Sequence, residues 1–276
     1  MKRTILLDGD LYLFKTCAAL ERPIRFRDDL VVLSSDPREC VRQFDRTVDS
    51  FINAVKADDV VLCFSAPGRH YFRHDILPTY KQNRTGTRKP LALAEATDTV
   101  KANYTCFSRP GLEGDDVMGI LSTNNSIIKG EKVIVSDDKD MKTIPGLLWR
   151  DGKVMEIDEE TADYYHMVQT LVGDSSDGYA GLTGCGPVKA ERLLGSERGY
   201  AALWPKVVKA FDKAGFSEEF ALVQARVARI LRTQDYNYDT KQPILWRPPV
   251  NEQRHEPGRP SFGDAADSAA ATACTE

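Results

Sequence analysis

Residues 4–10 read Thr-Ile-Leu-Leu-Asp-Gly-Asp, and this short segment indicates the fold class. An apolar run that stops at two acids around a glycine predicts a buried strand that ends in a turn. Residues 60–64 and 133–135 are further apolar runs of strand length. Fully apolar strands separated by helical segments are typical of a parallel sheet covered on both faces. We therefore expect an α/β fold with a parallel sheet at its core.

Helical patterns lie between these strands. Asp36-Pro37-Arg38-Glu39 has the signature of a helix start, with a capping acid, a proline at the first helical position and a glutamate three residues after the cap. Apolar residues follow at helical spacing as far as Val55, so one face of this helix should be buried. Residues 112–121 also look helical. Residues 30–33 are either a weaker strand or a loop.

The second half of the chain looks all helical from about residue 159. A glycine-rich turn at residues 181–188 separates two of its predicted helices. The last stretch is rich in Pro, Gly, Ala, Asp and Ser and has almost no large apolar residues, which predicts disorder. The predicted helices are residues 159–172, 189–194 and about 218–232. The expected organisation is an α/β core at 1–158, a helical region of the same catalytic unit at 159–247 and a disordered tail at 248–276.

Composition sets broad limits on function. The chain has 276 residues and a formal net charge of −4, which by itself argues mildly against DNA binding unless acids are occupied by metal ions. No apolar run reaches the length of a membrane span, and acids occur too early for a signal peptide, so we expect a cytoplasmic protein. The six cysteines are scattered, which predicts free thiols.

Acids recur where the predicted strands end. Asp8 follows the first strand, and Asp138 and Asp140 follow the third. Because the carboxyl ends of parallel strands form the ligand crevice, segments far apart in sequence would deliver carboxylates to one place. Such like charges need a counter-charge, and hard oxygen ligands favour Mg²⁺ or Mn²⁺. Taken singly, each acid could equally be a solvated loop residue or a helix cap. The candidate metal ligands are Asp8, Glu113, Asp115, Asp116, Asp138, Asp140, Asp174 and Asp177.

Two segments are suited to phosphate binding. Residues 69–89 carry six Lys or Arg against one acid, with Tyr71, Phe72 and Tyr80 among them. Basic side chains neutralise phosphates, and aromatic rings can stack on unpaired bases. The turn at residues 181–186 precedes a helix, so its backbone N–H groups can receive an anion. The alternatives are a solvated basic loop and a plain helix–turn–helix corner.

Residues 4–195 resemble the superfamily of 5′→3′ exonucleases and flap endonucleases, in the branch found in bacteriophages and in the N-terminal region of bacterial DNA polymerase I. Each motif is short, but their joint occurrence in one order is specific. The motifs that carry the resemblance are Leu6-Leu7-Asp8-Gly9, Phe72-Arg73, Tyr80-Lys81-Gln82-Asn83-Arg84, Leu112-Glu113-Gly114-Asp115-Asp116, Ser136-Asp137-Asp138-Lys139-Asp140, and Gly173-Asp174-Ser175-Ser176-Asp177 followed by the turn at 181–190.

The resemblance implies a PIN-like α/β core and a helix–three-turn–helix that grips duplex backbone and can bind K⁺. It implies Mg²⁺-dependent hydrolysis of phosphodiesters by two metal ions (Mg²⁺ or Mn²⁺), with release of 5′ products in DNA replication or degradation. The eight acids would bind the metal, and Lys81 and Arg84 would contact the scissile phosphate. The partner would be duplex DNA with a 5′ end or flap, or an RNA–DNA hybrid; no membrane is involved, and no protein partner is indicated. The expected DNA-binding residues are Arg73, Tyr80, Gly184, Gly186, Lys189 and Arg192.

The chain departs from the family pattern at three places. Ser65 stands where many members carry an aspartate, and Gly178-Tyr179-Ala180 replaces the usual Asn-Ile-Pro. Only 28 residues separate Arg84 from Glu113, so any arch is short, and exonuclease action on duplex ends is at least as well supported as flap cleavage. Two other interpretations stay open: a non-catalytic protein that binds DNA junctions, and a ribonuclease that prefers structured RNA.

Overall fold

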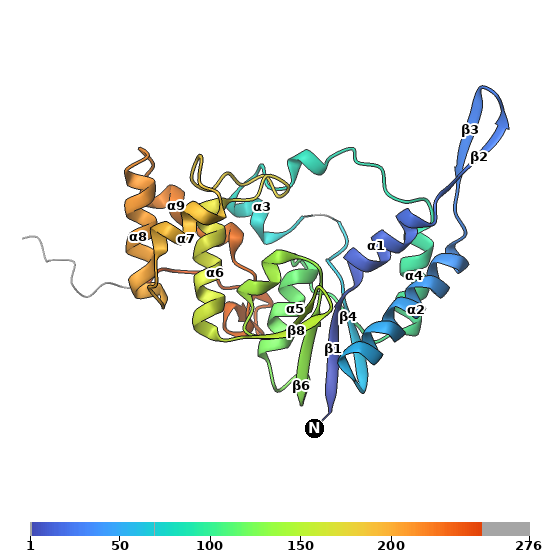
Figure 1. Ribbon diagram of the computed structural model, residues 1–276, viewed down its shortest axis with the longest axis horizontal. Helices are drawn as coiled ribbons and strands as arrows, with labels where there is room; N and C mark the ends of the chain where they lie inside the picture. Colours follow the sequence, from blue (N-terminus) through green and yellow to red (C-terminus); the bar gives the residue numbers. More distant parts are fainter. Residues whose placement is uncertain (1, 69, 250–276) are drawn as a thin grey trace, which may run out of the picture.

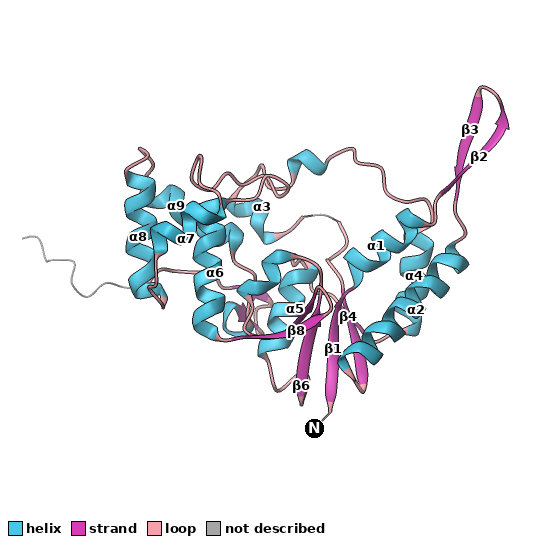
Figure 2. Ribbon diagram, viewed as in Figure 1, coloured by secondary structure: helices cyan, strands magenta, loops and turns pink. Residues whose placement is uncertain are grey.

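The computed structural model describes residues 2–68 and 70–249. A six-stranded sheet forms the centre, in the order β5-β4-β1-β6-β7-β8 (Figures 1 and 2). Every neighbouring pair is parallel except β7 and β8, which are antiparallel. The predicted parallel-sheet core is therefore confirmed, and most of the predicted tail lies outside the described residues. The strands of this sheet are β1 (Arg3–Asp8), β4 (Asp59–Cys63), β5 (Cys106–Phe107), β6 (Glu131–Val135), β7 (Gly146–Arg150) and β8 (Lys153–Ile157).

Strand β1 lies between β4 and β6 and is buried on both faces. Its Leu6 pairs with Val61 on one side and Ile134 on the other. Successive strand residues point to opposite faces, so Ile5 and Leu7 belong to one hydrophobic cluster and Leu6 to another. This explains why an unbroken apolar run, and not an alternating one, marks the central strand.

Helices cover both faces of the sheet (Figure 1). The first cluster lies under α1 (Gly9–Ala19), α2 (Pro37–Val55) and α4 (Leu93–Asn103). The second lies under α5 (Gly114–Thr123). The predicted start of α2 is confirmed, because the Asp36 carboxylate accepts a hydrogen bond from the backbone N–H of Arg38 at 2.9 Å.

The chain from residue 159 onward builds a helical region with its own hydrophobic cluster, which includes Met167, Leu171, Trp204 and Phe211. Helix α6 has the predicted bounds. Helix α8 contains Pro205 and was not predicted. The helices of this region are α6 (Glu159–Val172), α7 (Pro187–Leu194), α8 (Tyr200–Asp212) and α9 (Glu218–Ala228).

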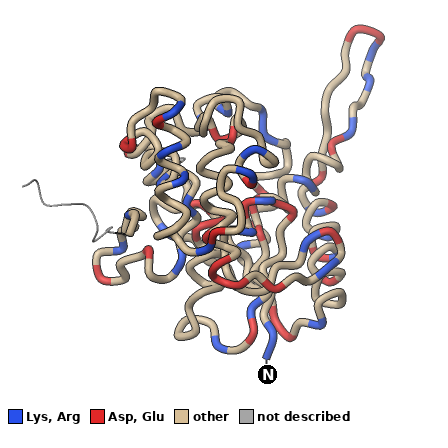
Figure 3. Tube along the Cα trace, turned by 60° about the vertical axis from the view of Figure 1, so that its left-hand side comes forward, with Lys and Arg blue, Asp and Glu red and all other residues tan. Residues whose placement is uncertain are grey.

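Residues 30–33 are a strand, but they lie outside the central sheet. Strand β2 (Arg22–Arg27) pairs antiparallel with β3 (Leu30–Ser34) in a hairpin that projects beyond α1, α2 and α4 (Figure 2). All residues of both strands are exposed, and Figure 3 shows basic residues along the hairpin and acids at its tip. The remaining elements are α3 (Phe72–Ile76), η1 (Gln82–Arg84), η2 (Lys139–Thr143), η3 (Thr233–Asp235), β9 (Tyr236–Asn237) and β10 (Gln242–Pro243). Within the described ranges, no helix combines the length and apolar character needed to cross a membrane.

Candidate functional site

The strand order brings Asp8 and Asp138 to the same edge of the sheet. Asp8 ends β1 and caps α1, because its Oδ1 accepts a hydrogen bond from the backbone N–H of Leu11 at 2.9 Å. Ser136, directly after β6, links the two acids: its hydroxyl donates to Asp8 Oδ2 at 3.2 Å and accepts from the backbone N–H of Asp138 at 3.1 Å. The two chain segments therefore meet through one buried hydroxyl.

Asp115 in the first turn of α5 completes a group with these two acids, which we call the strand-end cluster (Asp8, Asp115, Asp138). Burial raises the pKa of Asp115 well above its usual value, and the charges of Asp8 and Asp138 raise it further. Burial also raises the pKa of Asp8 to about 7. In the part of the chain that the structure describes, none of the three forms an ion pair with Lys or Arg. The carboxyl groups of Asp8 and Asp115 therefore resist ionisation, and no described Lys or Arg side chain pairs with them.

Glu113 and Asp116 are engaged inside the protein. Glu113 is the N-cap of α5, and its backbone N–H donates a hydrogen bond to the Asp116 carboxylate. Arg73 donates Nη1 and Nη2 to the two oxygens of Asp116 at 2.7 and 2.8 Å, and Nη1 also to Glu113 at 2.9 Å. The three residues are at most 5% exposed. Arg73 was expected to bind DNA and Asp116 to bind metal; in the structure they bind each other, and neither side chain is presented to solvent.

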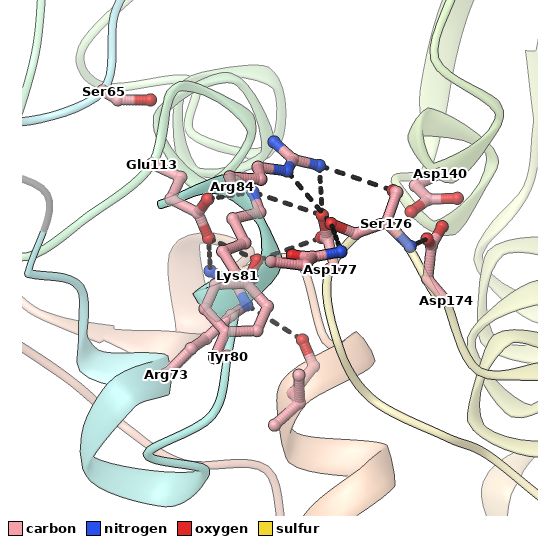
Figure 4. Close-up of polar contacts among 12 residues, drawn as sticks. Ser65, Arg73, Tyr80, Lys81, Arg84, Glu113, Asp140, Asp174, Ser176 and Asp177 are labelled. Atoms are coloured by element: carbon pink, nitrogen blue, oxygen red, sulfur yellow. Dashed lines mark hydrogen bonds and ion pairs between the residues drawn. The ribbon is translucent and has the colours of Figure 1, made fainter. Parts of the chain in front are cut away.

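Lys81 and Tyr80 contact the same glutamate from the basic segment (Figure 4). The ammonium of Lys81 donates to Glu113 and lies 3.5 Å from Asp177. The hydroxyl of Tyr80 lies 2.8 Å from Glu113 Oε2 and 3.1 Å from Asp177 Oδ2. Tyr80 is only 3% exposed, so its ring is not presented to solvent for stacking on a base.

The acidic loop at residues 174–178 packs against the basic segment through its backbone. The N–H of Lys81 donates to the carbonyl of Asp177 at 2.8 Å. A Cβ on Gly178 would lie 3.1 Å from the carbonyl oxygen of Thr79, and Gly178 has φ of 78°. Both the close approach and the left-handed backbone favour glycine here, which gives a physical reason for the departure from the family pattern at this position.

Side chains strengthen the same contact. Asn83 Nδ2 donates to the carbonyl of Ser175 at 2.8 Å, and Arg84 Nε donates to that of Ser176 at 3.0 Å. Arg84 Nη2 lies 2.5 Å from Asp177 Oδ1. Residues 79–84 and 174–178 thus form one wall of the site, although about 90 positions separate them in the sequence.

Lys139 neutralises the other two acids. Its ammonium lies 2.7 Å from Asp174 Oδ2 and 3.1 Å from Asp140 Oδ1. Burial opposes ionisation of Asp174, but the hydrogen bonds from Lys139 and Ser176 lower its pKa to about 2. Burial and the charge of Asp138 raise the pKa of Asp140 to about 6. Asp140 also accepts a hydrogen bond from Gln169 of α6, a residue that the sequence analysis did not select.

Acids from several segments face one small cavity, lined among others by Glu113, Asp115, Asp140 and Asp177. Counting only described residues, no group of three or more His, Cys, Asp or Glu side chains is placed so that it could hold a metal ion. Outside the strand-end cluster, the contacts above give one reason: Glu113, Asp140, Asp174 and Asp177 are directed at basic side chains.

The donor set nevertheless suits a divalent cation. Its atoms are carboxylate oxygens, the ligands that Mg²⁺ and Mn²⁺ prefer, and the strand-end cluster lacks direct positive compensation. A divalent ion would offset the burial, and the repulsion between neighbouring acids, that together raise the pKa of Asp8 and Asp115. The residues therefore fit such an ion in chemistry and in charge.

The glycine turn lies before α7 as predicted. Gly184 has φ of 67°, Gly186 is the N-cap of α7, and Lys189 donates from its ammonium to the carbonyl of Gly184 at 3.2 Å. Lys189 and Arg192 are both exposed. This surface therefore offers two exposed basic side chains beside a helix N-terminus, which suits contact with phosphates.

Asp10 was also missed in the sequence analysis. Its Oδ2 accepts a hydrogen bond from the backbone N–H of Ser65 at 2.7 Å, and the Ser65 hydroxyl accepts from the N–H of Gly114 at 3.0 Å. The two acids around Gly9 are a signal that could have indicated it. Figure 4 shows Ser65 on one side of Glu113, with Asp140 and Asp174 on the other.

The family model and two of the sequence relatives that match this chain are named as exonucleases. Residues 3–166 match a family model described as the 5′-3′ exonuclease N-terminal resolvase-like domain. The exodeoxyribonuclease of Enterobacteria phage T3 is 31% identical over 283 residues, covering 90% of this chain and 93% of that protein. The exonuclease of Escherichia phage T7 is also 31% identical over 283 residues, covering 90% of this chain and 94% of that protein.

Solved structures share the fold. The 5′-exonuclease of phage T5 with bound zinc superposes with a TM-score of 0.62 at 16% identity, covering 82% of this chain and 89% of that chain. The phage T5 flap endonuclease in a complex with DNA and metal ions gives a TM-score of 0.58 at 15% identity, with the same coverage.

Proposed function

Because the chain belongs to the 5′→3′ exonuclease family, we propose that it is a Mg²⁺-dependent 5′→3′ exonuclease that hydrolyses DNA from a 5′ end. The relatives from phages T3 and T7 are named as exonucleases and align over nine-tenths of this chain. Membership of the family makes the chain a phosphodiester hydrolase. The metal, the residues that hold it and the preferred substrate are the parts that we propose.

The observation that carries the proposal is the convergence of acids from β1, α5, the end of β6 and the loop at 174–178 on one edge of the sheet. We assign one ion to the strand-end cluster and a second ion to Asp140, Asp174 and Asp177, with Glu113 between the two groups. Bound divalent ions supply a nucleophilic water at neutral pH and polarise the phosphate. Binding at the second group requires Lys139 to leave Asp140 and Asp174.

Lys81 and Arg84 are the residues that we assign to the phosphate. Both lie beside the acidic cavity, and the Arg84 side chain is half exposed, so it can reach a bound strand. Their positive charges would stabilise the negative charge that develops on the scissile phosphate. Arg73, Tyr80 and Asp116 support this arrangement from inside the protein, since each is nearly inaccessible to solvent.

Residues 159–247 would hold the duplex. Gly184, Gly186, Lys189 and Arg192 surround the start of α7, where backbone N–H groups and basic side chains can bind phosphates without reading bases. We assign K⁺, where it binds, to this glycine turn. Because such contacts follow the backbone, an RNA–DNA hybrid is a second candidate substrate.

The test is cleavage of a 5′-labelled duplex and a matched 5′-flap duplex, with Mg²⁺ and with EDTA. Release of short 5′ products with Mg²⁺ but not with EDTA supports the proposal. The ratio of the cleavage rates on the two substrates shows whether the protein acts mainly as an exonuclease or as a flap endonuclease. DNA binding without cleavage, both with Mg²⁺ and with EDTA, would favour a junction-binding protein instead. Faster cleavage of structured RNA would favour a ribonuclease.

A further inference from the structure

The end of β4 has no acid in the sequence, yet a carboxylate occupies its neighbourhood. Residue 65 is a serine, and both its polar groups are used locally: the N–H donates to Asp10, and the hydroxyl accepts from Gly114. The Asp10 carboxylate comes from the first turn of α1 and reaches across to β4. The Asp10 side chain, which comes from the helix that follows β1, is thus held against the end of β4.

Close packing fixes this position. A Cβ on Gly9 would lie 2.6 Å from the ring of Phe64, so the turn between β1 and α1 fits against β4 only because residue 9 has no side chain. A Cβ on Gly114 would lie 3.3 Å from Asp10 Oδ2. The first turns of α1 and α5 and the end of β4 therefore converge on the Asp10 carboxylate.

Only one oxygen of that carboxylate is used by the described residues. Oδ2 accepts the hydrogen bond from Ser65, and no hydrogen bond from a described residue reaches Oδ1. Asp10 is exposed and lies two residues after Asp8, beside the helix start that carries Asp115. Its charge is therefore fixed in place next to the strand-end cluster, with a free oxygen.

We propose that Asp10 is a positioning residue of the metal site, and that its carboxylate supplies at the end of β4 the negative charge that Ser65 does not. The inference rests on the proposed metal-dependent function. A carboxylate adjacent to the ligands increases the attraction for a divalent ion and orders the polar groups around it. The rival explanation is that Asp10 serves only as an acceptor for the Ser65 N–H.

Three variants of the full chain separate these explanations. Asp10→Asn keeps an oxygen that can accept from Ser65 but removes the charge. Asp10→Ser combined with Ser65→Asp moves the carboxylate to the other residue of the pair, where it can still accept from Gly114. Asp59→Asn is the matched control. Asp59 lies at the start of β4, the end opposite to Ser65, and pairs with Lys2.

The measurement is Mn²⁺ binding to the DNA-free protein, followed by the electron paramagnetic resonance signal of free Mn²⁺. Asp10→Asn should weaken the tightest Mn²⁺ binding about 10-fold or more, within the range found for carboxylates that support metal ligands. Asp59→Asn should leave it unchanged, and the double swap should restore it to within about threefold of wild type. The thermal unfolding midpoint of Asp10→Asn in EDTA should equal or exceed that of wild type, because the change removes a like charge beside the strand-end cluster.

Three results would overturn the inference. Unchanged Mn²⁺ binding in Asp10→Asn, with wild type binding normally, would remove only the role of Asp10. A drop in the metal-free unfolding midpoint of Asp10→Asn would show that the carboxylate is structural. Wild-type protein that binds no Mn²⁺ would remove both the inference and the proposed metal-dependent function.

Discussion

Arg73 and Asp116 form a bidentate ion pair inside the protein, with donor–acceptor distances of 2.7 and 2.8 Å. Arg73 also donates to the carbonyl oxygens of Val227 and Arg229, and Asp116 accepts from the N–H of Leu231. The pair therefore ties α3 and α5 to the chain that leaves α9. The Phe-Arg part of the family signature thus joins the two halves of the molecule through the buried Arg73 side chain.

Replacing Arg73 by Met should destabilise the protein strongly, because it leaves the Asp116 carboxylate buried without its partner. We expect a loss of roughly 3–5 kcal/mol in the free energy of unfolding, the range for breaking a buried ion pair from one side. Urea unfolding followed by circular dichroism measures it. The double variant Arg73→Met with Asp116→Leu should lose less than Arg73→Met alone. A loss below about 1 kcal/mol for the single change would contradict the structural role.

Replacing Asp115 by Asn should separate catalysis from stability. We expect cleavage to fall roughly 100-fold or more, as when one electrostatic stabiliser of a transition state is removed, while the Kd for duplex DNA measured in Ca²⁺ stays within about threefold. In EDTA the variant should be more stable than wild type, because the raised pKa of Asp115 shows that its charge is unfavourable in the folded protein near pH 7. Mg²⁺ should raise the melting temperature of wild type more than that of the variant. Equal activity would remove Asp115 from the metal site.

His166 should make stability depend on pH. Its Nε2 donates to the carbonyl of Ala225 at 2.8 Å, and its Nδ1 accepts from the hydroxyl of Tyr200 at 2.9 Å. Burial, and then the charge of Arg229, hold its pKa well below 6.5. Below pH 6.5 the unfolded chain binds a proton that the folded protein does not, so stability falls as the pH falls, by up to about 1.4 kcal/mol per pH unit.

The comparison protein for this prediction is His166→Gln. Subtracting its unfolding free energy from that of wild type between pH 5 and 8 removes the contribution of the acids that both proteins share. The difference should be flat above about pH 7 and slope below about pH 6.5. A flat difference over the whole range would mean that His166 takes up its proton in the folded state.

The sequence predicted the central strands well because burial on both faces leaves an unbroken apolar run, as in β1. It did not predict β5, which has two residues, or β7 and β8, which are only partly buried and carry polar residues. Those strands exist because neighbouring strands offer hydrogen-bonding edges, and this depends on topology instead of local pattern. Helix α8 was missed because Pro205 lies inside it.

The candidate site shows the same limit. Acids at strand ends could be found from sequence, because strand ends converge in any parallel sheet. The sequence could not show which of these acids pair with basic side chains. Arg73 and Asp116 are 43 positions apart, and Lys139 and Asp174 are 35 positions apart. Asp10 was overlooked for a related reason: its partner, the N–H of Ser65, is a backbone group that no side-chain pattern reveals.

The last prediction concerns the exposed basic side chains of α7. Lys189 and Arg192 are exposed and lie one helical turn apart, so both can face the same backbone. Each phosphate that a basic side chain neutralises releases a counterion and contributes about 0.9 to the slope of log Kd against log salt. Lys189→Met should therefore weaken duplex binding at low salt and reduce that slope by about 0.9, with the cleavage rate at saturating DNA nearly unchanged. Lys213→Met, at an exposed lysine beyond the end of α8, should alter neither quantity. An unchanged slope in Lys189→Met would mean that the duplex is held elsewhere on the protein, and the basic segment at residues 69–89 would become the surface to test.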